Sequence, residues 1–175
     1  MSILTGYTKV CKKTSGGVLT IGLIEKENFK GATLDADSDA YSAITLAAQS
    51  AFSKYEFLED EAEFKEDTKR ENGSVVIKLP TMNAASRKAV QEIIDASYCG
   101  LVAVVITPNG DAFVVGYGED VKLERPLRIS QSTGTTGKKF SDANGDEVTL
   151  TCDHTEKSRI YSGDTDALFT AAPGA

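Results

Sequence analysis

The residues best suited to catalysis are few and lie far apart in the sequence. His154 is the only histidine, and it follows Asp153 at the end of an alternating polar and apolar segment. A serine or cysteine nucleophile needs a base and a third group that orients the base, and no such set is visible. We therefore expect His154 to be a surface imidazole, and we expect no catalytic residues and no enzymatic activity.

The cysteines do not form a recognisable metal site. Cys11, Cys99 and Cys152 include no CxxC pair, and an odd number leaves at least one cysteine unpaired. A zinc site built from one histidine and three dispersed cysteines has no known ligand spacing. We expect buried free thiols, no bound metal and no cofactor.

Two acidic segments resemble the start of a calcium-binding loop. Asp35, Asp37 and Asp39 have the right initial spacing, but Ala40 stands at the sixth position and Leu46 at the twelfth. An EF-hand requires glycine and glutamate at those two places. The segment 142–146 fails in a similar way, because its glycine comes too early. The pattern leaves room only for weak, adventitious cation binding.

Glycines near Lys138 invite comparison with a phosphate-binding loop. Only two residues separate Gly134 from Gly137, whereas a P-loop has four between its glycines and then Lys-Ser or Lys-Thr. The segment also lacks apolar periodicity, which predicts a flexible loop over about residues 131–139.

Carboxylates are dense between residues 56 and 67, where Lys65 is the only basic residue. Glycosidases use two carboxylates at a defined separation across a cleft, which neighbours in sequence cannot demonstrate. We expect a solvated acidic face. Its members are Glu56, Glu59, Asp60, Glu61, Glu63, Glu66 and Asp67.

Composition narrows the function further. Nineteen basic and 26 acidic residues give a net charge of −7, which disfavours tight binding to DNA or RNA. The N-terminal residues show no signal-peptide pattern, and no segment approaches the roughly 18 apolar residues of a membrane span. We expect a chain that is made and kept in the cytosol, as one domain over residues 1–175.

Most elements are expected to be strands. The range 20–24 is typical of an apolar strand. Residues 74–79 are rich in β-branched residues and stop at Pro80, and residues 147–152 alternate between polar and apolar. Residues 41–53 fit a helix or a strand, with strand preferred. The segment 108–111 predicts a hairpin between residues 101–107 and 112–117, and the first of these should lie centrally because both of its faces are apolar.

One helix is expected at about residues 83–96. Asn83 is suited to cap it, and Ala85, Ala89, Val90, Ile93 and Ile94 form an apolar stripe. The helix should cover one face of the central strand. The expected fold class is therefore mainly β (α+β), an antiparallel β-sandwich or barrel flanked by one α-helix, with a loose C-terminal tail over about residues 165–175.

This order of elements resembles that of small bacteriophage tail tube proteins. The resemblance covers most of the chain, from about Val18 to Ser162, and no single residue in it is diagnostic. It consists of the entry strand at 20–24, the hairpin ending at Pro80, the helix from Asn83, the hairpin at 108–110, the Thr/Gly loop at 132–137 and the strand at 147–152.

The resemblance implies a structural role. Proteins of that family form rings, usually hexameric, that stack into a hollow tube in the virion tail and contain no catalytic residues. It implies assembly in the host cytoplasm, contacts with other phage tail or neck proteins, no membrane, and DNA that passes without specific binding. A lumen lined with carboxylates would repel the DNA backbone, and Glu59, Asp60, Glu61 and Glu63 are the candidate lumen face.

Two segments are candidates for contacts between subunits. One is residues 34–53. The other is the loop at residues 131–139, whose candidate contact residues are Ser132, Thr133, Gly134, Thr135, Thr136, Gly137, Lys138 and Lys139.

Other functions remain open from the sequence. A tail terminator, a neck ring or a head decoration protein would form single rings or isolated copies. A monomeric β-sandwich binding module would usually display an aromatic platform, yet the chain has no tryptophan. An enzyme is the least favoured alternative.

Overall fold

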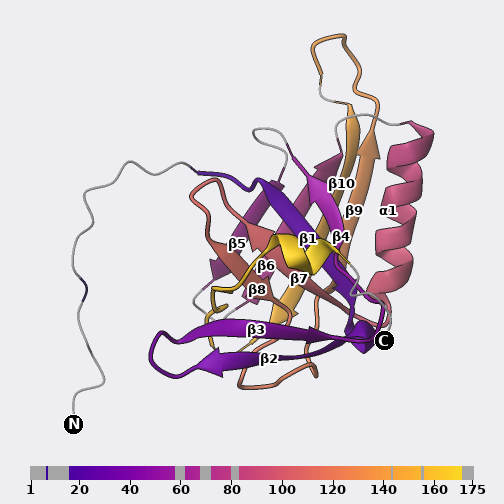
Figure 1. Ribbon diagram of the computed structural model, residues 1–175. Coiled ribbons are helices and arrows are strands. Elements are labelled where there is room, and N and C mark those ends of the chain that lie inside the picture. Colours follow the sequence, from indigo (N-terminus) through magenta and orange to yellow (C-terminus); the bar gives the residue numbers. More distant parts are fainter. Residues whose placement is uncertain are drawn as a thin grey trace.

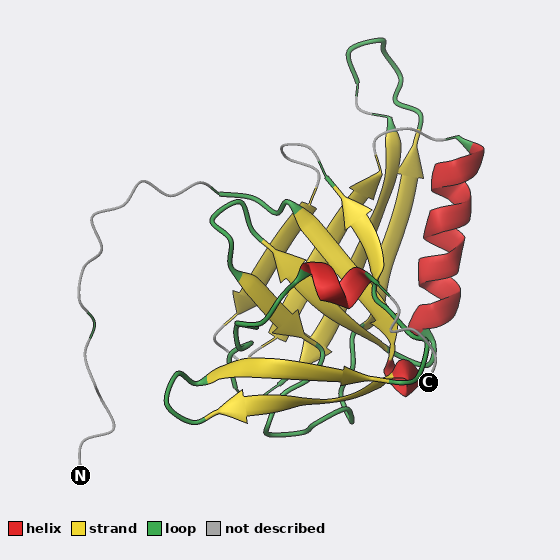
Figure 2. Cartoon of the chain, in the orientation of Figure 1, coloured by secondary structure: helices red, strands yellow, loops and turns green. Residues whose placement is uncertain are grey.

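Antiparallel strands make up most of the structure, a computed structural model that describes residues 7, 16–57, 62–67, 72–79, 83–142, 144–154 and 156–170. The described residues form ten strands, one α-helix and two short 3-10 helices, η1 (Lys26–Asn28) and η2 (Asp166–Phe169). The predicted mainly β fold with a single α-helix is confirmed (Figure 2).

The first sheet has the strand order β4-β1-β7-β8 and is built around an apolar hairpin. Strand β7 (Leu101–Ile106) is buried over its first five residues, as expected for a central strand with two apolar faces. It pairs with β8 (Ala112–Val115) through the predicted turn and with β1 (Thr20–Glu25) on its other side. Strand β4 (Ser53–Glu56) pairs with β1 at one edge.

The second sheet has the order β5-β6-β10-β9, with β5 at Ala62–Asp67, β6 at Asn72–Leu79, β9 at Arg128–Thr135 and β10 at Gly145–Asp153. Alternate residues of β10 from Asp146 to Cys152 are buried, which confirms the predicted alternation. Their side chains share one core with residues of the first sheet, such as Ile21 and Val105. The two sheets therefore face each other across that core.

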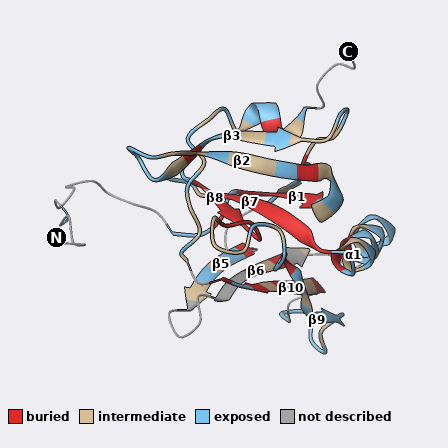
Figure 3. Cartoon of the chain, turned by 90° about the horizontal axis from the view of Figure 1, so that it is seen from below, coloured by how far each residue is buried: buried red, intermediate tan, exposed pale blue. Residues whose placement is uncertain are grey.

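A third layer covers the other face of the first sheet (Figure 3). It consists of η2 and of the hairpin formed by β2 (Phe29–Asp35) and β3 (Ala40–Leu46). Residues 40–46, for which the sequence fitted a helix or a strand, are therefore a strand. The aromatic rings of Phe29 and Tyr41 pack on Tyr117, with centroid distances of 5.0 and 5.7 Å. Val102 and Val104 of β7 belong to this second core.

Helix α1 (Ala84–Ser97) confirms the predicted helix to within one residue at its C-terminal end. Asn83 Oδ1 accepts a hydrogen bond from the N–H of Ser86 at 2.8 Å, and the Ser86 hydroxyl accepts one from the N–H of Asn83, so the cap is reciprocal. Val90 and Ile93 enter the core between the two sheets, whereas Ala85 of the predicted stripe is exposed. The helix thus lies beside the two-sheet core, and the face of β7 beyond that core is covered by β2 and β3.

Two predictions about irregular segments were wrong. Residues 131–135, expected in a flexible loop, belong to β9 and pair with β10. In the tail expected to be loose over about residues 165–175, Asp166–Phe169 form η2, in which Leu168 is buried and its carbonyl accepts the N–H of Phe52 at 2.8 Å, and residues 171–175 lie outside the described residues. One buried leucine and one backbone hydrogen bond fix this short helix against the first sheet.

Among the described residues, no helix is both long and apolar enough to cross a membrane. The longest helix, α1, has 14 residues, and charged side chains occupy its outer face.

Candidate functional site

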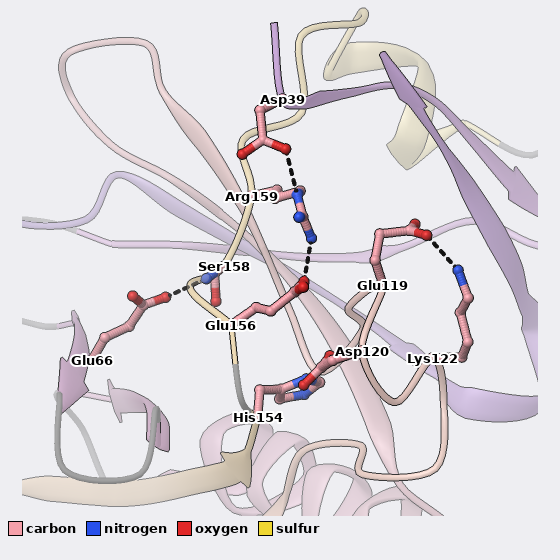
Figure 4. Close-up of polar contacts among 9 residues, drawn as sticks. All are labelled: Asp39, Glu66, Glu119, Asp120, Lys122, His154, Glu156, Ser158 and Arg159. Carbon is pink, nitrogen blue, oxygen red and sulfur yellow. Dashed lines mark hydrogen bonds and ion pairs between the residues drawn. The ribbon is translucent and has the colours of Figure 1, made fainter. Parts of the chain in front are cut away.

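His154 is buried, contrary to the predicted surface position. Its side chain is 8% exposed, and its Nδ1 lies 3.3 Å from Oδ1 of Asp120, which is equally buried (Figure 4). The residue continues the alternation of β10 by one step, because Cys152 and His154 both point inward. The alternation of polar and apolar residues in β10 indicated this burial, but the predicted strand ended at Cys152, two residues before His154.

The geometry of His154 suits a structural contact better than nucleophile activation. Its Nε2 is buried and has no hydrogen-bond partner among the described residues, whereas a catalytic histidine places this kind of nitrogen against the nucleophile. Gly118 leaves room for the pair, because a Cβ there would lie 2.5 Å from Asp120 Oδ1 and 3.0 Å from His154 Nδ1. The pair ties the loop after Tyr117 to the end of β10.

Arg159 joins the turn between β2 and β3 to the segment after β10. Its Nε lies 3.1 Å from Asp39 Oδ1, and its second guanidinium nitrogen lies 2.6 Å from Glu156 Oε2 (Figure 4). Burial alone would lower the pKa of Arg159, but the hydrogen bonds to Glu156 and Asp39 outweigh it and raise the pKa. The guanidinium therefore stays charged at every ordinary pH.

The same segment also covers one edge of the first sheet. The N–H of Val114 donates to the carbonyl of Arg159 at 3.0 Å, and the N–H of Tyr161 donates to Ala112 at 2.7 Å. On its other side, the N–H of Tyr41 donates to Ile160 at 2.8 Å. Residues 159–161 thus lie between β8 and β3, and the edge of β8 is occupied within the chain.

Strand β9 has the longest uncharged edge in the described part of the chain. It pairs only with β10 there, and seven of its eight residues are exposed. Charged residues and prolines usually stop an edge strand from pairing with another chain. After Arg128, β9 contains neither. The register shift in its pairing lies near Leu150, so Gln131 to Thr135 pair regularly.

The other edges are shorter, charged, interrupted or partly covered. Strand β3 is uncharged, but residues 160–162 pair with it at Tyr41 and occupy the start of its edge. Strand β4 has four residues and an ion pair between Lys54 and Glu56 at 2.8 Å, and β5 carries Glu63 and Lys65. Strand β2 has two register shifts in its pairing with β3. Short length, charge and bulges all oppose strand addition, so β9 is the edge best suited to it.

The candidate lumen residues lie mostly outside the described residues, which exclude Glu59, Asp60 and Glu61. Glu63 is exposed on β5. Glu66 of the same acidic run is partly buried, where it accepts the N–H of Ser158 at 2.9 Å and approaches Lys157 at 3.6 Å. The exposure of Glu63 is compatible with the predicted acidic face, whereas Glu66 makes contacts within the chain.

The candidate contact loop divides into two parts. Ser132 to Thr135 belong to β9, and Thr136 to Lys139 begin the loop toward β10. Asp142 Oδ2 accepts hydrogen bonds from the N–H groups of Lys138 and Lys139 at 2.8 and 2.9 Å. These two bonds lower the pKa of Asp142 and organise the turn.

The other candidate segment, residues 34–53, contains β3 and the turn before it. Asp35 Oδ1 accepts the N–H of Asp37 at 3.1 Å, and Oδ2 accepts the Ser38 hydroxyl at 2.9 Å. The bonds from Ser38 and Asp37 lower the pKa of Asp35. The acidic triplet is therefore a hydrogen-bonded turn in which the Asp35 oxygens already have partners.

The cysteines differ in their surroundings. Cys152 is buried as predicted, Cys99 is exposed, which corrects the prediction, and Cys11 lies outside the described residues. Neither Cys99 nor Cys152 forms a disulfide among the described residues. Over the part of the chain that the structure describes, no three histidine, cysteine or acidic side chains come together to hold a metal ion.

Comparisons with known proteins give no match: no family model, no curated protein and no solved structure is significantly similar to this chain. The surfaces of the chain are therefore the basis for inferring its function.

Proposed function

We propose that this chain is a structural protein that assembles with itself into stacked rings, forming the tail tube of a bacteriophage virion. Subunits would assemble in the host cytoplasm, contact other tail or neck proteins, and let DNA pass without specific binding. Hexameric rings are the arrangement that the family resemblance implies. No catalytic step, metal or cofactor is part of the proposal.

The open edge of β9 is the observation that carries this proposal. An unpaired strand can continue its sheet into a neighbouring subunit through backbone hydrogen bonds. A contact between two different surfaces of the same chain closes into a ring when its rotation divides a full turn. β9 would supply one such surface, since Gln131 to Thr135 are exposed and uncharged.

The charge of the chain supports the second half of the proposal. A net charge of −7 and the exposed Glu63 would keep a DNA backbone from adhering to a tube wall. Because screening at physiological salt limits this repulsion to about 8 Å, it acts only on DNA that is close to the wall.

Lysines placed on the edge of β9 test the proposal. Gln131 and Thr133 face away from the core, opposite Thr149 and Glu147 of β10. We expect the double variant Gln131→Lys, Thr133→Lys to remain folded, with a stability change within about 0.5 kcal/mol, and to lose self-assembly. Sedimentation velocity over a range of protein concentrations measures the loss.

A neutral double variant, Gln131→Ser with Thr133→Ser, is the matched control. It keeps the edge uncharged and should assemble like the original chain. If the lysine variant assembles as well as this control, β9 is not a subunit contact.

A further inference from the structure

The loop between β9 and β10 projects beyond the sheets and carries a fully exposed aromatic residue (Figures 1 and 2). Phe140 has no part of its ring covered, and Lys138 and Lys139 precede it. The bonds from their N–H groups to Asp142, and the bond from Asp142 N–H to Lys139 O at 3.0 Å, give this tip a defined turn. An aromatic side chain on an organised loop is available to enter an apolar pocket of a partner, where it would bury a large area.

A groove of about 470 Å³ runs between α1 and the strands β1 and β4. Its apolar lining includes Leu23, Ile93 and Leu101, and Tyr55 forms part of the wall. Four carboxylates also line it, and none of the described lining residues is basic. These carboxylates are Glu25, Glu27, Glu92 and Asp95.

The groove has a negative electrostatic character. Burial raises the pKa of Tyr55, and the charges of Glu92 and Glu25 raise it further, because a tyrosinate would be repelled there. Lys88 approaches Glu92 at 3.8 Å from the exposed side of the helix, which offsets one of the four negative charges. An apolar floor with an acidic rim matches an aromatic side chain accompanied by lysines.

The tip and the groove lie at opposite ends of α1. Arg87, near the start of the helix, pairs with the buried Asp146 at 2.8 Å, next to the β9–β10 loop. The groove is lined by the other half of the helix, from Glu92 to Ala96, and by Cys99 just beyond its end, and Figure 1 shows the loop projecting away from that half. A tip that enters the groove of a second copy would therefore join two molecules head to tail.

We propose that the Lys138-Lys139-Phe140 tip of one copy docks in the groove between α1 and β4 of another copy, with Phe140 on the apolar floor and the lysines at the acidic rim. This inference rests on the proposed self-assembly and assigns its axial contact, which stacks one ring on the next. A head-to-tail contact of unlike surfaces that does not close propagates as an open stack.

Charge reversal on each side tests the docking. The variant Lys139→Glu places a negative charge at the acidic rim, and Asp95→Lys places a positive charge opposite the lysines. We expect each variant alone to need at least a tenfold higher protein concentration to form stacks. We expect an equimolar mixture to recover stacking, because each altered surface then meets a complementary one.

Phe140→Ala is the corresponding test of the anchor. Its side chain is fully exposed, so the melting temperature should not change, while stacking should require at least tenfold more protein. The control for Lys139→Glu is Lys65→Glu, which makes the same change of charge at an exposed position of β5 and should stack normally. Negative-stain electron microscopy and sedimentation velocity report the length of the assemblies.

The outcomes separate the two proposals. Stacks that are unaffected by Phe140→Ala and by both charge reversals would overturn the docking and leave the tube function standing. Single rings from the variants, with stacks from the original chain, would support the docking. A chain that stays monomeric at every concentration would overturn both.

Discussion

Tyr41 is the largest fully buried side chain of the described core, and its hydroxyl group has no hydrogen-bond partner there. Burial and the charge of Glu119 raise the pKa of Tyr41 to about 12, against the opposing effect of Arg159. A buried hydroxyl without a partner is held neutral, because its charged form would lose the solvation of water.

The substitution Tyr41→Phe should therefore change the pH dependence of stability. In the unfolded chain this tyrosine loses its proton near pH 10, whereas in the folded chain it keeps it to about pH 12. The folded chain therefore binds more protons than the unfolded chain in that window, and its free energy of unfolding falls as the pH rises. Between pH 8 and pH 11, the free energy of unfolding of the phenylalanine variant should fall by on the order of 1 kcal/mol less than that of the original chain. Urea unfolding at both pH values measures the difference.

At neutral pH the same variant should be about as stable as the original chain, because the hydroxyl makes no hydrogen bond of ordinary length and angle, although the guanidinium of Arg159 is near it. A loss above about 2 kcal/mol at pH 7 would show that the hydroxyl has a partner, in contradiction to this account.

Single residues also show where sequence reasoning reached its limit. The cap at Asn83 was predictable because it has a local cause, a side chain that can accept the free N–H groups of the first turn. His154 was misplaced because the alternation of β10 was ended at Cys152, and its partner Asp120, which lies 34 residues away in the sequence, could not be identified from a local pattern. The exposed Phe140 was not singled out, since an aromatic residue in a polar loop has no pattern around it.

At the scale of elements, η2 is a short helix whose one fully buried side chain is Leu168. Leu168 is buried in the core beneath β2 and β3, and it is one residue from the half-buried Phe169. The substitution Leu168→Ala should destabilise the chain by about 2 to 4 kcal/mol, as a cavity in a packed core does. Chemical unfolding measures this loss.

The neighbouring substitution Ala167→Ser is the control, because Ala167 is exposed. It should change stability by less than about 0.5 kcal/mol. If Leu168→Ala proved equally neutral, the docking of η2 would not contribute to the stability of the fold.

Elements were predictable where one face is apolar. Helix α1, the β7–β8 hairpin and the alternation of β10 follow from local patterns of apolar residues. Most of β9 was missed because both of its faces are exposed, so neither alternation nor an apolar run marks it. Residues 159–161 could not be placed between β8 and β3 from sequence, since their pairing is set entirely by distant strands.

At the scale of the whole molecule, the open surfaces have different characters and different positions. The β9 edge offers unpaired backbone, the β9–β10 tip offers an aromatic residue with lysines, and the groove beside α1 offers an acidic rim at the other end of the helix. In the proposed assembly, the β9 edge would make the contacts within a ring, and the tip and the groove would make the contacts between rings. This separation is what a stacked tube requires, because each ring must close and still bind the next.

The most direct test of this account is negative-stain electron microscopy of the purified chain over a range of protein and salt concentrations. The account predicts rings that stack into tubes with a central channel as the protein concentration rises. A chain that remains monomeric at the highest concentration would contradict it.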